Sequence, residues 1–134
     1  MTQTTRHTPL TSNAIDDALV PWQRAIYKGN LAFESGELIT ARDHYTVASS
    51  CAETLLAQLS NIPINQLVTR SLEHCIAAFV VATLNLADTF KVMQKPEKAC
   101  TWLCHAHQQL SMLLSHPELQ VSHLGPASSS QNLL

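Results

Sequence analysis

The feature that most constrains the fold of this chain is a run of apolar and small residues that recur every three or four positions between Gly36 and Pro63. This spacing places its members on one face of an α-helix, whereas a half-buried strand would alternate them every second position. Glycine and proline at the two ends are residues that terminate helices. The pattern predicts a helix over residues 37–60, with an inner stripe of Leu38, Ala41, Tyr45, Ala48, Ala52, Leu55 and Leu59.

Three further segments carry the same periodicity, over residues 22–35, 65–94 and 96–116. Proline precedes the first and opens the third, and proline is well tolerated in the first turn of a helix. Ser12 or Asn13 is a suitable cap for a shorter helix before them. Because the connections between the long segments are short, neighbouring helices are expected to be antiparallel.

Composition agrees with a helical domain of modest size. The chain has 134 residues, which favours one domain, and its few glycines and aromatic residues suit helices better than a sheet. Residues 1–12 are polar and threonine-rich and are expected to form a disordered arm, while the Gly-Pro and serine run within 117–134 predicts a flexible tail. The helical domain is therefore assigned to residues 13–116.

The charge distribution narrows the classes of partner. The formal net charge is −2, and the eight Lys and Arg residues form no basic cluster of the kind that binds phosphates, so no nucleic-acid partner is expected. No apolar run approaches the ~18 residues of a membrane span or marks a signal peptide. We therefore expect a cytoplasmic protein, with no membrane partner, whose cysteines are reduced thiols. Charged residues make up 13% of the chain, about half the usual ~25%, which favours coverage of some surface by another protein.

Residues 25–48 carry a set of small and aromatic residues at a recognisable spacing: Gly29, Gly36, Ala41, Tyr45 and Ala48. The segment resembles a tetratricopeptide (TPR) repeat, a family of antiparallel helix hairpins. In that arrangement Gly29 and Ala41 allow the two helices to approach closely, Tyr45 fills the space beside them, and Gly36 forms the turn.

Residues 83–106 look like a second, more divergent copy, with Ala87, Phe90, Ala99, Leu103 and Ala106 at the matching positions and Gln94 in place of the turn glycine. The two copies are offset by 58 residues, whereas TPR repeats recur every ~34 residues. In this respect the chain is similar to small bacterial TPR-like families, and the resemblance implies an all-α fold. It implies TPR-like antiparallel helix hairpins that form a compact bundle of four main helices, with long central helices.

The resemblance also implies where a partner would bind, because TPR arrays hold peptides in a groove lined by the first helix of each pair. The groove candidates are Gln23, Ile26, Asn30, Phe33, Glu34, Val81, Leu84, Asp88 and Lys91. Asn30 and Asn85 match the asparagines of carboxylate-clamp TPR domains, but Ile26 stands where such domains keep a lysine.

A second constellation lies in the last predicted helix. Cys100, Cys104 and His107 are spaced i, i+4 and i+7, so they share one helix face, and thiolate and imidazole are ligands that zinc accepts. The spacing differs from the paired cysteines of a structural zinc site, and free cysteine is also a small buried hydrophobe. No cofactor and no catalytic residues are predicted.

The residues thus favour a non-enzymatic protein-interaction or adaptor module, with a protein or peptide partner and with homodimerisation as an additional hypothesis. One alternative is a small metal- or thiol-dependent regulator built on Cys100, Cys104 and His107. Another is a secretion-chaperone-like protein, because such chaperones also use TPR-like folds.

Overall fold

The computed structural model describes residues 12–115, and this part of the chain is helical throughout, with no strand. It contains a short helix, α1 (Ser12–Ala18), and four longer ones: α2 (Val20–Glu34), α3 (Leu38–Leu59), α4 (Gln66–Val92) and α5 (Pro96–Leu114). The all-α prediction is confirmed, and each long helix ends within about two residues of the predicted position. The predicted disordered arm, apart from Ser12, and the predicted flexible tail lie outside the described residues.

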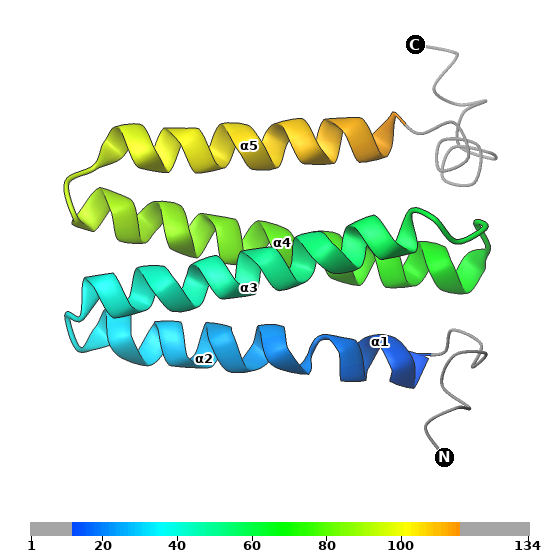
Figure 1. Ribbon diagram of the computed structural model, residues 1–134, viewed down its shortest axis with the longest axis horizontal. Helices are drawn as coiled ribbons and strands as arrows, with labels where there is room; N and C mark the ends of the chain where they lie inside the picture. Colours follow the sequence, from blue (N-terminus) through cyan, green and yellow to red (C-terminus); the bar gives the residue numbers. More distant parts are fainter. Residues whose placement is uncertain (1–11, 116–134) are drawn as a thin grey trace, which may run out of the picture.

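Successive long helices run antiparallel, as Figure 1 shows. α3 packs against α2 on one side and α4 on the other, whereas α5 packs mainly on α4. α1 continues the line of α2 toward the end of the molecule where α3 and α4 are joined. The order of packing is therefore α2, α3, α4, α5, and α5 is the long helix with the fewest neighbours.

Local chemistry explains where α4 begins. Pro63 disfavours helical structure in the residue before it and prevents α3 from continuing. Asn65 then caps α4, because its side-chain oxygen accepts a hydrogen bond of 2.8 Å from the backbone N–H of Val68. The break and the cap together fix the sharp reversal between the two longest helices.

The turns between α2 and α3 and between α4 and α5 have the same backbone form, although they are 58 residues apart. Gly36 has φ +78° and Gln94 has φ +63°, so both residues occupy the left-handed region that commonly ends a helix. In each turn the following residue donates its N–H to the carbonyl oxygen five positions earlier at 2.8 Å, Glu37 to Ala32 and Lys95 to Phe90. The offset found in the sequence thus recurs in backbone geometry.

The core is built with small residues where three helices meet. Ala25 of α2, Ala48 of α3 and Ala82 of α4 form one buried cluster, in which short side chains allow the helices to approach. A larger cluster, centred on Leu72 and Phe79, lies toward the end where α1 is found. A further cluster around Tyr45, Leu86 and Phe90 lies toward the turns described above; its buried members are Ala32, Ala41, Tyr45, Leu86, Ala87, Phe90 and Ala99.

Two contacts fix α2 on the rest of the bundle. The indole N–H of Trp22 donates a 3.0 Å hydrogen bond to the backbone carbonyl of Ala78 in α4. Gly29 lies against the ring of Tyr45, so closely that a Cβ at position 29 would be 2.5 Å from the Cε1 atom of that ring. The close approach expected at Gly29 is present, and the side chain nearest to it is Tyr45.

Candidate functional site

Seven of the nine groove candidates are exposed, and we call the surface that they form the α2–α4 surface. The two helices that carry them contact one another and both pack on α3. The exposed members are Gln23, Asn30 and Glu34 on α2 and Val81, Leu84, Asp88 and Lys91 on α4. The α4 members follow one another every three or four residues and therefore share one face of that helix.

Ile26 and Phe33, the other two candidates, are half-buried. Phe33 packs against the cluster around Tyr45, and Ile26 packs against that cluster and against Ala25, Ala48 and Ala82. Their main contacts are thus with the interior of the protein, and a partner on the α2–α4 surface would meet the polar side chains first.

Tyr45 links the three helices beneath this surface. It is only 3% exposed, and its hydroxyl donates a 2.5 Å hydrogen bond to Oδ1 of Asn30. Burial raises the pKa of Tyr45 above its usual value, and the negative charges of Glu34 and Asp88 raise it further. Glu34 of α2 and Asp88 of α4 thus both act electrostatically on one buried group of α3.

The α2–α4 surface combines acidic and apolar character. Lys91 pairs with Asp88 at 3.8 Å, an exposed contact that contributes at most about 1 kcal/mol. Within the described residues Glu34 forms no salt bridge. Val81 and Leu84 lie on the same helix face and are 41% and 50% exposed. This combination suits a ligand that carries a positive charge beside an apolar group.

The cysteine and histidine residues of α5 are only partly brought together. The Sγ atoms of Cys100 and Cys104 are 4.0 Å apart on the exposed side of the helix and form a weak thiol–thiol hydrogen bond. This bond raises the pKa of the Cys104 thiol. Among residues 12–115, no group of three or more His, Cys, Asp or Glu side chains is placed to hold a metal ion, so His107 does not complete a three-ligand site. His105 turns instead toward α3, where its Nε2 lies 3.2 Å from a carboxylate oxygen of Glu53.

Comparison with known sequences adds one relationship. The family model DUF2753, which is described as a protein of unknown function, matches residues 20–129, most of the chain. The chain belongs to the DUF2753 family. No curated protein and no solved structure gives a match. The match begins at Val20, the first residue of α2, so it includes all four long helices and excludes α1.

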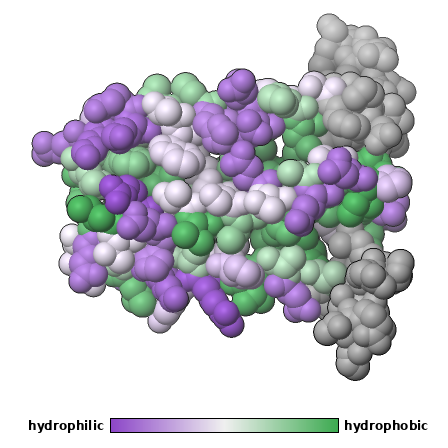
Figure 2. Space-filling view, viewed as in Figure 1, coloured by the Kyte–Doolittle hydropathy of each residue, from purple (hydrophilic) through white to green (hydrophobic). Residues whose placement is uncertain are grey.

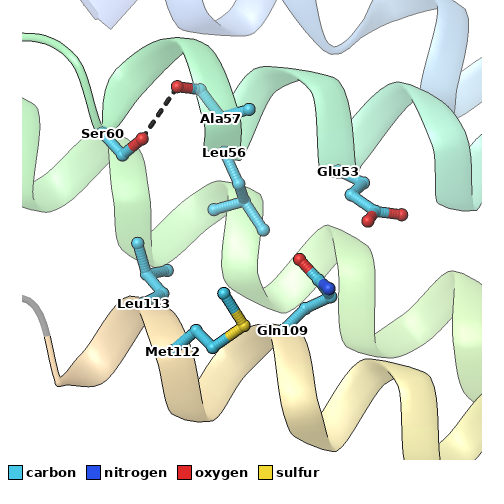
Figure 3. A pocket seen from close by; sticks show the side chains of 7 residues that line it. All are labelled: Glu53, Leu56, Ala57, Ser60, Gln109, Met112 and Leu113. Atoms are coloured by element: carbon cyan, nitrogen blue, oxygen red, sulfur yellow. Dashed lines mark hydrogen bonds between the residues drawn. The ribbon is translucent and has the colours of Figure 1, made fainter.

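The DUF2753 chain also has a groove that the sequence did not reveal, between the second halves of α3 and α5. It encloses about 290 Å³ and is lined by Glu53, Leu56, Ala57, Ser60, Gln109, Met112 and Leu113. Figure 3 shows Leu56 pointing from α3 toward Met112 and Leu113 on α5, with Glu53 about one turn before Leu56 on α3. The groove exists because α5 packs on α4 and leaves its side toward α3 incompletely covered.

Among residues 12–115, α4 is the helix that meets the length and composition of a membrane span, with a mean hydropathy of 1.5 in its most apolar window. Half of that window is buried inside the protein, and the central helix of a globular bundle has the same properties. The apolar character of α4 is accounted for by its position between α3 and α5. Figure 2 shows that apolar residues also reach the outer surface among polar ones on the face in view.

Proposed function

We propose that this DUF2753 protein is a non-enzymatic interaction module that binds a protein or peptide on the α2–α4 surface. The observation that carries the proposal is an exposed surface on which acids from two helices, Glu34 of α2 and Asp88 of α4, accompany the exposed apolar side chains of Val81 and Leu84. Both helices pack on α3, so the backbone positions that carry the two acids are set before a partner arrives. Such pre-organisation lowers the ordering cost of binding.

The chemistry of the surface specifies the kind of partner. A lysine or arginine side chain would gain from Glu34 directly and from Asp88 by displacing Lys91 from its weak, exposed pair, and an adjacent apolar side chain would cover Val81 and Leu84. An acidic peptide of the type held by carboxylate-clamp domains would be repelled, because Glu34 and Asp88 face the site and position 26 is isoleucine. The proposed ligand is therefore a cationic, partly apolar peptide segment in the cytoplasm.

A TPR-like arrangement of hairpins is part of this proposal. Two observations support it: the equivalent turns at Gly36 and Gln94, and the contact between Gly29 and Tyr45 at the first helix crossing. In such an arrangement α2 and α4 are the first helices of the two pairs, and the surface between them is the one that TPR proteins use for peptides. The secretion-chaperone alternative stays a prediction.

The test compares partner capture by three forms of the full chain. Affinity purification from native cells is done with the parent, with the Glu34→Lys/Asp88→Lys variant, and with Glu73→Lys. Glu73 is an exposed acid of α4 about two turns before Val81, so it controls for a charge reversal on the same helix outside the surface. We expect proteins retained by the parent and by Glu73→Lys to be lost from the double variant, with helical content unchanged. Equal retention by the double variant would refute the proposed surface.

A further inference from the structure

Cys100 and Cys104 lie one helical turn apart on the exposed side of α5, away from the α2–α4 surface. Their Sγ atoms are separated by 4.0 Å. The two thiols open onto a shallow hollow of about 560 Å³, lined by Glu97, Cys100, Thr101, Cys104, His105 and Gln108. The site is thus a pair of accessible thiols whose relative position is set by a continuous helix.

The separation of the two sulfurs is closer to that in a metal dithiolate than to that in a disulfide. Metal–thiolate bonds of ~2.3 Å on either side of one ion span up to ~4.6 Å, and about 3.8 Å at a tetrahedral angle. A spacing of 4.0 Å lies between these values, so one ion fits between the sulfurs with little movement. A disulfide would need the same atoms at ~2.05 Å, about 2 Å closer, and would therefore require the side chains to turn.

The ligand set also constrains the ion. Thiolates are soft ligands that favour Cu(I), zinc and iron–sulfur centres. Zinc in structural sites takes four ligands, whereas the described residues offer no third His, Cys, Asp or Glu in reach of the pair. His105 is occupied by Glu53 on α3, at 3.2 Å. The pair therefore suits an ion that two thiolates hold without further protein ligands.

We propose that Cys100 and Cys104 form a chelating dithiol for a soft, thiophilic metal ion of low coordination number, with Cu(I) as the representative ion. Binding replaces the two thiol protons, which are released to solvent, and forms two metal–sulfur bonds with no change in oxidation state. The bound ion joins adjacent turns of α5, the long helix that rests mainly on α4. This site is independent of the proposed peptide surface.

The other two cysteines provide the controls. Cys75 is fully buried in the core, where a metal ion in solution does not reach it, and that burial raises its thiol pKa to about 11. Cys51 is half-buried on α3 and has no second cysteine one turn away. Replacement of Cys51 by serine thus removes one thiol from the chain without altering the proposed chelate.

The experiment is an anaerobic titration of the full chain with Cu(I) in competition with a chromogenic Cu(I) chelator. We expect one tightly bound ion per chain in the parent and in Cys51→Ser. Cys100→Ser and Cys104→Ser should each bind about 100-fold more weakly, because the remaining thiol no longer benefits from a linked second ligand. Circular dichroism of each variant checks that the fold is retained, since both positions are exposed.

Two results would overturn the proposal. One is binding of Cu(I) by Cys100→Ser or Cys104→Ser that is as tight as binding by the parent. The other is a parent chain that retains no Cu(I) in competition with the chelator.

Discussion

The two equivalent turns allow a reciprocal test of backbone strain with substitutions of opposite sign. Gly36 and Gln94 both have positive φ, yet only glycine adopts that conformation without a steric penalty. Replacing Gln94 by glycine should therefore stabilise the protein, and replacing Gly36 by glutamine should destabilise it. Nothing lies within 4 Å of the position that a Cβ on Gly36 would take, so the second substitution changes the backbone term and creates no clash.

The size of the expected change in the free energy of unfolding follows from two opposing contributions. A left-handed residue other than glycine costs ~1–2 kcal/mol in the folded state. Glycine in turn loses more conformational entropy on folding, by roughly 0.5–1 kcal/mol. The net expected change in the free energy of unfolding is about +0.5 to +1 kcal/mol for Gln94→Gly and about the same size with opposite sign for Gly36→Gln.

Urea denaturation followed by circular dichroism measures both effects. With a slope of ~1.5 kcal/mol per M, a change of 0.75 kcal/mol moves the midpoint by roughly 0.5 M. The double exchange should restore a midpoint near that of the parent if the two turns act independently. A lower midpoint for Gln94→Gly would refute the argument, because it would mean that the glutamine side chain stabilises the turn by more than its backbone conformation costs.

Three further predictions concern the core and the surface of α4. The Thr83 hydroxyl is buried with no hydrogen-bond partner among the described residues, so Thr83→Val should raise the free energy of unfolding by about 1 kcal/mol, measured in the same assay. The thiol pKa of Cys75 is raised to about 11, so the parent should lose more stability than Cys75→Ala as pH rises from about 9 to 11; equal pH profiles would exclude the thiol as a cause. Homodimerisation through the exposed face at Val81 predicts a sedimentation-equilibrium mass near twice 14.7 kDa that Val81→Asp reduces to the monomer value, whereas a parent mass of 14.7 kDa would refute the dimer.

The helices were predictable because their limits are set locally. Gly36, Pro63 and Pro96 interrupt the periodic stripes at sites where backbone chemistry alone stops or starts a helix. The predicted helix over residues 37–60 and the observed Leu38–Leu59 differ by one residue at each end. The lateral position of α5 was not predictable in this way, because it depends on how Ala99 and Ala106 seat on α4 rather than on any signal within the segment.

Individual site residues were easier to name than the contacts among them. The resemblance to TPR repeats pointed to Asn30, Glu34 and Asp88, but the hydrogen bond from Tyr45 to Asn30 and the effect of the two acids on Tyr45 emerge only when three helices are assembled. Likewise, the pairing of His105 with Glu53 joins residues that are 52 positions apart. The i, i+4 relation of Cys100 and Cys104 was predictable because one helix determines it.

The limited packing of α5 has a consequence for how the native protein fluctuates. Only Ala99 and Ala106 of α5 are buried, whereas α4 buries residues along its whole length. Local opening should therefore begin by detachment of α5, with the α2–α3–α4 core still closed. In native-state hydrogen exchange, the amides of α5 should exchange earliest among the four long helices. Trp102, half-buried against the cluster around Tyr45, would report this detachment by fluorescence, while Trp22, hydrogen-bonded to Ala78, would change only when the core opens.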